Sequence, residues 1–264
     1  MRGASAANPW LRRQAWASVH RAACLLLGRV FIALGALAGA APLQAAGFED
    51  TMGQRMLACT GCHGEQGRAV GNVYFPRIAG KPAGYLFNQL RNFRDGQRPY
   101  ALMSGLLSFM SDDYLQQIAR YFAALDLPYP TPAGLTLTPA QQERAAELVR
   151  QGDPARGIAA CATCHGPALT GLAPHVPGLL GLPRDYLNAQ LGAWKTGQRR
   201  SHAPDCMAAI TKGLTADEVA LISHWLSAQP LPDDTHAVTR LPAMPGGAAR
   251  PLCGSAPELV GGGP

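Results

Sequence analysis

The sequence lacks three patterns that would place it in other classes of protein. No stretch alternates apolar and polar residues over the length of a half-buried strand, and no βαβ pattern is present. The apolar run at residues 30–41 is too short, and too rich in Gly and Ala, for a typical membrane span. Acidic residues are missing from residues 1–46. The missing strand patterns predict an all-α fold.

Residues 1–46 have the composition of a secretory signal peptide. Five arginines come first, a short apolar run follows, and small residues continue to Ala46. We expect cleavage between Ala40 and Ala46, and therefore export to the bacterial periplasm. The alternative is that the segment is retained as an anchor. Cys24 follows no lipid-attachment box and is expected to leave with the segment.

The net charge of +6 comes mostly from this leader. Without its five arginines, 18 basic and 17 acidic residues remain. A nearly neutral protein gives no support to binding of a polyanion. Nucleic acid is therefore not expected among the partners.

Two copies of Cys-x-x-Cys-His carry the chemistry of this chain. They are Cys59, Cys62 and His63 in the first copy, and Cys161, Cys164 and His165 in the second. Each copy is the attachment signature of a c-type haem, in which two thiols bond to the porphyrin and the imidazole binds the iron. A zinc half-site, a thioredoxin-like pair or a disulfide staple would not need a His after each pair. The sequence therefore predicts two covalently bound haem c groups.

The two motifs belong to an internal repeat. The first unit reads GYLFNQLRNFRDGQR from Gly84, and the second reads DYLNAQLGAWKTGQR from Asp185. Helices are expected at residues 51–58, 85–93, 111–125, 139–150, 186–194 and 215–228, from apolar spacing and N-terminal Ser or Thr residues. Gene duplication explains the matching order of these segments.

This repeat predicts the organisation of the chain. The expected parts are a signal peptide (1–46), a first haem-binding domain (47–127), a linker (128–138), a second haem-binding domain (139–230) and a Pro- and Gly-rich tail (231–264). Three prolines within residues 128–132 predict a fairly stiff linker. The tail has almost no periodicity and is expected to be irregular or disordered.

Met103 and Met207 are the candidate sixth ligands of the two irons. Each follows its haem motif at nearly the same distance, on a segment expected to be a loop before the last helix of its unit. A thioether ligand favours reduced iron, whereas the alternative for any single Met is core packing. Met110 is a rival in the first unit; His175 and His202 are rivals in the second but are expected at the surface.

Two further matched pairs have open interpretations. A carbonyl at Pro76 or Pro177 is in position to accept the Nδ1 proton of the haem-binding His, or these prolines simply turn a loop. Arg98 and Arg199 end the matched Gly-Gln-Arg segments. They are candidates for pairing with haem propionates, and the alternative is a pair of solvated surface charges.

Two cysteines remain once the leader and the haem motifs are set aside, Cys206 and Cys253. In an exported protein such a pair often forms a disulfide. Our hypothesis is a bond that fastens the tail over the segment that carries Met207. Two free thiols are the alternative.

These segments together resemble the dihaem cytochrome c4 family, exported bacterial proteins of two class I cytochrome c domains. The likeness covers about residues 50–230, in the motifs CTGCHGEQG, FPRIAG and YLFNQLRNFRDGQR, then GDPARGIAACATCHGP and YLNAQLGAWKTGQRR. It implies tandem all-α domains related by duplication, with haems close across a pseudo-twofold interface. It also implies iron ligation by His63 with Met103 and by His165 with Met207.

The function that this resemblance implies is one-electron transport, not catalysis. Expected partners are a membrane quinol-oxidising complex or a dehydrogenase as donor, and an oxidase or reductase as acceptor, with peripheral membrane association as an option. One alternative is the cytochrome subunit of a membrane dehydrogenase. Another is a dihaem peroxidase or thiosulfate-oxidising enzyme, which would need an open iron site. The matched methionines Met103 and Met207 argue against such an enzyme.

Overall fold

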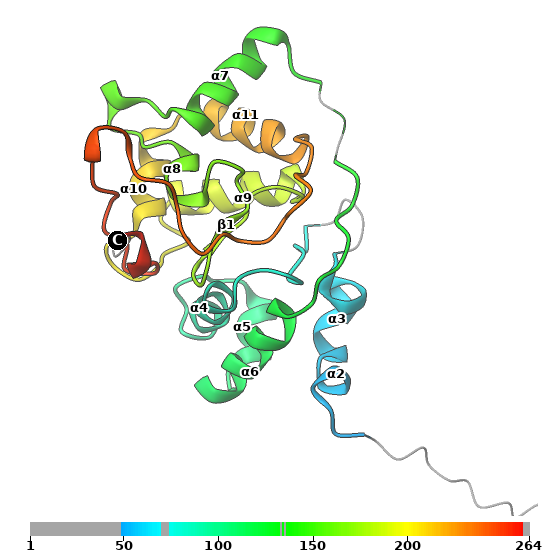
Figure 1. Ribbon diagram of the computed structural model, residues 1–264. Helices are drawn as coiled ribbons and strands as arrows, with labels where there is room; N and C mark the ends of the chain where they lie inside the picture. The colour runs from blue at the N-terminus through cyan, green and yellow to red at the C-terminus, as the bar shows by residue number, and fades with distance from the viewer. Residues whose placement is uncertain (1–48, 70–73, 133, 135, 261–264) are drawn as a thin grey trace, which may run out of the picture. The chain divides into compact units, whose positions relative to one another are not determined.

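The computed structural model describes residues 49–69, 74–132, 134 and 136–260 (Figure 1). The expected signal peptide and its cleavage site lie outside these residues. The chain divides after Glu49, and Asp50 begins one compact unit that holds both Cys-x-x-Cys-His motifs. Within the described residues, every helix falls short of the length or the apolar content that crossing a bilayer takes.

The first half, residues 50–127, is built from helices. These are α2 (Met52–Arg55), α3 (Leu57–His63), α4 (Ala83–Arg94), α5 (Ala101–Leu107) and α6 (Asp112–Ala123), with a short 3₁₀ turn at Glu65–Gly67. Thr51 and Ser111 begin α2 and α6, because each side-chain oxygen accepts a hydrogen bond from a first-turn backbone N–H. Helix α4 packs against both α5 and α6.

The second half, residues 139–230, repeats this arrangement. Its helices are α7 (Pro139–Arg150), α8 (Cys161–His165), α9 (Arg184–Lys195), α10 (Cys206–Gly213) and α11 (Ala216–Ser227), with a 3₁₀ turn at Pro154–Arg156. Thr138 and Thr215 begin α7 and α11 with capping boxes. Helix α9 packs against α10 and α11, and α7 packs against α11. The expected all-α class is confirmed.

A small β-hairpin and the three short helices α5, α8 and α10 were not expected from the sequence. Strands β1 (Gly171–Leu172) and β2 (Val176–Pro177) pair in antiparallel register. Two residues per strand are too few to show an alternating pattern. The expectation that Met103 and Met207 lie on loops was wrong, because they lie on α5 and α10. The side chain of Asp205 begins α10 by accepting from a first-turn N–H.

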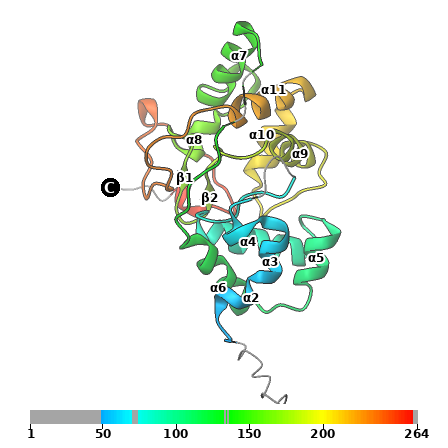
Figure 2. The same cartoon turned by 90° about the vertical axis from the view of Figure 1, so that its right-hand side faces the viewer.

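The helices α2 to α6 and the helices α7 to α11 form two separate groups (Figure 2). Each half has its own hydrophobic core. In the first half, buried Met56, Leu115, Ile118 and Phe122 pack together. In the second half, the corresponding core includes Ala145, Leu148, Val149, Val219, Ile222, Trp225 and Leu226. Separate cores are what a duplicated unit would produce. The division into independent domains at 47–127 and 139–230 remains a prediction, since both halves belong to one compact unit.

Hydrogen bonds join the two halves and the start of the linker. The Tyr85 N–H donates to the Pro174 carbonyl at 3.0 Å, and the Arg200 N–H donates to the Gln97 carbonyl at 2.8 Å. The buried guanidinium of Arg77 donates to the Pro128 carbonyl at 2.9 Å and stacks on the Tyr129 ring. These contacts fix the start of the Pro-rich linker against the first half.

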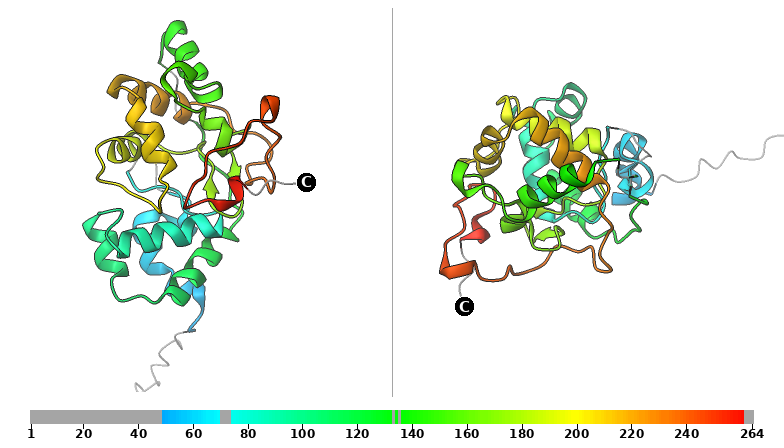
Figure 3. Two further views of the ribbon diagram at one scale, coloured as in Figure 1. Left: turned by 90° about the vertical axis from the view of Figure 1, so that its left-hand side faces the viewer. Right: turned by 90° about the horizontal axis from the view of Figure 1, so that it is seen from above.

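The tail is irregular but packed, from residue 231 to residue 260 (Figure 3, orange to red). Val238 pairs with Gly171 and Ala173 through backbone hydrogen bonds beside β1. Leu259 is buried in a small cluster with Leu172 of the hairpin. The irregular conformation was expected. The alternative of disorder was wrong for this segment, because its apolar residues bury against the hairpin.

Candidate cofactor site

The two Cys-x-x-Cys-His motifs end short helices in the same way. His63 is the last residue of α3, and α8 consists of the second motif alone. Gly64 and Gly166 follow at φ values of 77° and 82°, which glycine adopts readily. Within each helix the two cysteines are three residues apart and therefore share a face. The chain turns away directly after each His.

The four motif cysteines form no disulfide with any described residue. Burial raises the pKa of the Cys161 thiol to about 11 and also raises the pKa of Cys59 and Cys164. Among the described residues, no three His, Cys, Asp or Glu side chains gather as ligands for a metal ion. The two thiols of each motif are therefore available for attachment of a haem.

Both motif histidines are buried and held in one tautomer. His63 Nδ1 lies 2.9 Å from the Pro76 carbonyl oxygen, and His165 Nδ1 lies 2.7 Å from that of Pro177. Because a carbonyl oxygen only accepts, Nδ1 carries the proton and Nε2 keeps its lone pair for a metal. Burial lowers the pKa of both imidazoles, which also favours the neutral form. The predicted carbonyl contacts are confirmed.

One cavity of about 930 Å³ brings all the predicted site residues together. Its lining includes Cys59, Cys62, His63, Met103, Cys161, Cys164, His165 and Met207. Met110 also lines it, whereas His202 does not. His175 lines the cavity too, and its Nδ1 lies 2.9 Å from a Glu258 oxygen, so its expected place at the surface was wrong. Ligation of iron by the two methionines stays a prediction.

Arg98 and Arg199 line this cavity as buried side chains. The alternative of solvated surface charges was therefore wrong, and pairing with propionates stays a prediction. Sequence reasoning missed the role of Gln89 and Gln190, whose side-chain oxygens accept from both guanidinium groups. The signal was present, because the two glutamines occupy matching positions in the repeat.

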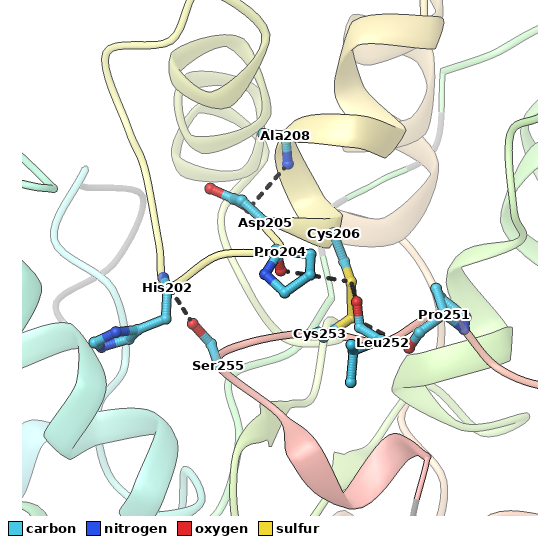
Figure 4. Close-up of a disulfide and its surroundings, with 9 residues drawn as sticks. All are labelled: His202, Pro204, Asp205, Cys206, Ala208, Pro251, Leu252, Cys253 and Ser255. Carbon is cyan, nitrogen blue, oxygen red and sulfur yellow. Dashed lines mark hydrogen bonds between the residues drawn. A yellow bond between two sulfur atoms is a disulfide. The ribbon is translucent and has the colours of Figure 1, made fainter.

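The hypothesis of a Cys206–Cys253 disulfide is confirmed (Figure 4). The two Cα atoms lie 5.5 Å apart, and the bond joins the tail to the first residue of α10, directly before Met207. Hydrogen bonds flank it, from the His202 N–H to Ser255 Oγ and from the Gly254 N–H to the Pro204 carbonyl. The tail is therefore fixed over the start of the helix that carries Met207.

The residues around the cavity fit two haem c groups. The lining is largely apolar, and each set of thiols and imidazole comes from one short helix. Trp194 also lines the cavity, and its buried indole N–H has no hydrogen-bond partner among the described residues. The carboxylates of a porphyrin would pair with the buried cations and accept a hydrogen bond from the unused indole N–H.

No protein-family model matches the chain, but it is similar to cytochromes and electron acceptors of known name. It is 36% identical over 208 residues to a thiosulfate dehydrogenase electron acceptor of Thiomonas intermedia, covering 78% of this chain and 88% of that protein. It is 30% identical over 203 residues to cytochrome c4 of Pseudomonas aeruginosa, covering 76% of this chain and 98% of that protein.

Solved structures extend the likeness to the fold. Cytochrome c4 of Pseudomonas stutzeri has a TM-score of 0.57 at 26% identity, over 66% of this chain and 94% of that chain. A thiosulfate dehydrogenase of Marichromatium purpuratum has a TM-score of 0.58 at 32% identity, over 66% of this chain but 36% of that chain. Fold and site together define a dihaem c-type cytochrome, a protein of electron transfer. The chain belongs to the cytochrome c4 family.

Proposed function

We propose that this protein is a periplasmic one-electron carrier, with one iron ligated by His63 and Met103 and the other by His165 and Met207. The observation that carries the proposal is the shared cavity, which both motifs and both methionines line. Two redox centres in one cavity are suited to passing an electron from one to the other. Each bound haem supplies the one-electron exchange between ferrous and ferric iron.

The protein's own residues would prepare this exchange in three ways. The carbonyls of Pro76 and Pro177 hold the imidazoles in the tautomer that leaves Nε2 available. The apolar lining excludes water, which keeps reorganisation small. Met103 and Met207 would each supply a thioether to an iron, a ligand that favours the reduced state. A filled sixth position suits a carrier better than an enzyme.

The proposed electron donor is a thiosulfate dehydrogenase. Two relatives, from Thiomonas intermedia and Stutzerimonas stutzeri, are named as thiosulfate dehydrogenase electron acceptors, at 36% and 34% identity. The dehydrogenase activity itself is not carried over to this chain, which spans 36% of the Marichromatium protein. A respiratory oxidase or reductase is the proposed acceptor.

Export to the periplasm is supported by two features. Residues 1–46 have the composition of a signal peptide. The Cys206–Cys253 disulfide suits an oxidising compartment, since such bonds are rare in the cytoplasm.

Anaerobic mixing with a purified thiosulfate dehydrogenase and thiosulfate tests this function. We expect both haems to become reduced only when enzyme and substrate are both present. The oxidised protein alone should show the red-edge charge-transfer band of a thioether bound to ferric iron, at two-haem intensity. Oxidation of thiosulfate by this protein alone would identify an enzyme instead. Failure of reduction with the dehydrogenase, but not with a small-molecule reductant, would reject this donor.

A further inference from the structure

Four buried cations line the cavity without a carboxylate partner among the described residues, and one of them, Arg77, is 2% exposed and stacks on the Tyr129 ring. Arg98 and Arg199 are 8% and 3% exposed, and Lys81 is 4% exposed. None of the ion pairs among the described residues includes any of them. Lys81 Nζ donates to the Gly178 carbonyl at 3.2 Å, which satisfies a donor but leaves the charge uncompensated. Buried charges of this kind are stable only beside an anion.

The two arginines share neutral acceptors across the two halves. Gln89 Oε1 accepts from Arg98 at 3.0 Å and from Arg199 at 2.6 Å. Gln190 Oε1 accepts from the same two side chains at 2.6 and 2.8 Å. Two like charges are thereby held side by side, and burial together with repulsion by Arg98 lowers the pKa of Arg199 to about 10. Neutral amides hold this geometry but do not cancel the charge.

The two halves differ at one position beside these arginines. The Arg199 guanidinium lies 3.6 Å from the centre of the Trp194 ring, and the Arg98 guanidinium lies 4.4 Å from that of Phe93. Phe93 and Trp194 occupy the same place in the repeat. Trp194 has an indole N–H, which is buried and without a partner among the described residues. Phe93 has no donor at all.

We propose that the Trp194 Nε1–H donates to a propionate carboxylate of the haem attached at Cys161 and Cys164, beside Arg199. The proposal rests on the haem sites of the proposed function. The haem attached at Cys59 and Cys62 lacks an equivalent donor, because Phe93 stands in its place.

This difference predicts unequal reduction potentials for two otherwise matched centres. A propionate's negative charge stabilises ferric iron, and a hydrogen bond to that carboxylate disperses part of the charge. The second haem should therefore be easier to reduce than it would be without the indole donor. Trp194 acts here as a positioning and tuning residue, since it does not touch the iron.

A reciprocal pair of variants tests the proposal in the holoprotein. Trp194→Phe keeps a ring under Arg199 and removes the donor, whereas Phe93→Trp adds a donor to the first half. We expect Trp194→Phe to lower the reduction equilibrium constant of the second haem about threefold. For a one-electron couple this lowers its reduction potential by about 28 mV. The first haem should not change. In Phe93→Trp the first haem alone should become easier to reduce.

Two-wave voltammetry gives the potentials, and the NMR signals of the haem methyl groups assign each wave to its haem. The indole N–H signal of Trp194 in the reduced protein is a second readout. We expect slow exchange with solvent and loss of this signal in Trp194→Phe. An unchanged second potential, or an indole N–H that exchanges as fast as an exposed one, would overturn the proposal.

Two measurements distinguish a failure of this proposal from a failure of the proposed function. They are the haem count and the charge-transfer band of the thioether bound to ferric iron. If both variants keep two haems and the full band while the second potential is unmoved, the carrier function stands and the propionate contact is rejected. If the wild-type protein holds fewer than two haems or lacks the band, the site assignment itself fails. A thermal melt shows that each variant is folded before its potentials are compared.

Discussion

The two halves of this protein match where the cofactor would bind and differ around it. Both hold a buried His against a proline carbonyl, and both place a Met at the cavity. Around that shared set, the second half adds the disulfide-bonded tail, and its ion pairs gather on Glu218, whereas those of the first half gather on Asp95 and Asp112. The residues that would hold the cofactor are therefore of the same type in both halves, whereas the residues around them differ between the halves.

The faces beside the two methionines illustrate this divergence. The repeat pairs Leu102 with Cys206, and Phe109 with Gly213. Leu102 is 65% exposed and Phe109 is fully exposed, whereas Cys206 is bonded to the tail. The second half is thus covered by the tail at Cys206, where Leu102 of the first half is open, whereas Gly213 is exposed like Phe109. The predictions below test how far the two halves are equivalent.

The largest effect is expected from removing one pair of haem thiols. The double variants Cys59→Ser/Cys62→Ser and Cys161→Ser/Cys164→Ser should each lose one of two haems, because covalent attachment needs the thiols. A ferrous pyridine spectrum with a protein assay gives the haem count, and intact mass confirms it.

The double variant Cys206→Ser/Cys253→Ser is the matched control and should keep both haems. If either haem-motif variant kept two covalently bound haems, the attachment sites assigned here would be wrong. Equal losses in the two halves would support their equivalence at the cofactor.

Removing the disulfide should destabilise the second half alone. The bond spans 47 residues, and the loop-entropy relation gives an upper value of about 4 kcal/mol in the free energy of unfolding. We expect Cys206→Ser/Cys253→Ser to unfold at lower urea concentration, and the tail to become open to proteolysis near residue 250.

Ser255→Ala is the control, because it removes the hydrogen bond to the His202 N–H and keeps the covalent bond. It should leave the tail resistant to protease. A double-serine variant with unchanged urea midpoint would show that packing around Leu259 holds the tail without the bond.

The next effect concerns acid stability, through Glu218. Hydrogen bonds from Arg156 at 2.7 Å and from Arg144 at 2.9 Å lower the pKa of this carboxyl from 4.5 to about 2. A carboxyl with a lowered folded-state pKa stabilises the protein above about pH 4.5, and this contribution is lost as pH falls towards 2. The first half has Tyr114, which carries no carboxyl, at the matching position.

Glu218→Gln should therefore cost about 1–2 kcal/mol at pH 7, after allowance for solvent screening, and less below pH 3. Urea unfolding at pH 7 and pH 3 measures the difference. Glu147→Gln is the control, since Glu147 forms a half-exposed pair with the same Arg144 and should have little effect. An equal cost at both pH values would reject the ion-pair explanation.

Sequence reasoning predicted the longer helices and the candidate residues that line the cavity, because both depend on local patterns. Ser111 and Thr215 mark the start of the last helix in each half, and each Cys-x-x-Cys-His motif places its ligands within one helical turn. The duplication then made Met103 and Met207 the candidate ligands, and both line the cavity, whereas single-residue reasoning would have left them as core residues.

The parts that could not be predicted depend on contacts between distant segments. Val238 of the tail meets the β1 strand some seventy residues earlier, and no periodicity in the tail signals this pairing. The burial of Arg98 depends on Gln190 and Tyr186 from the other half. A composition rich in Pro and Gly indicates irregular backbone, but burial of a few apolar residues such as Leu259 decides whether it is ordered.

The smallest effect is expected at Phe109, whose side chain is fully exposed. Phe109→Ala should change the free energy of unfolding by less than about 0.5 kcal/mol, because no buried contact is lost. At the matching position, a Cβ on Gly213 would lie 2.8 Å from a side-chain carbon of Ile158, so Gly213→Ala should cost more, about 1–3 kcal/mol. Urea unfolding of both variants gives the comparison. A clear loss for Phe109→Ala would mean that this face is packed in solution, and the contrast between these two matched positions would then fail.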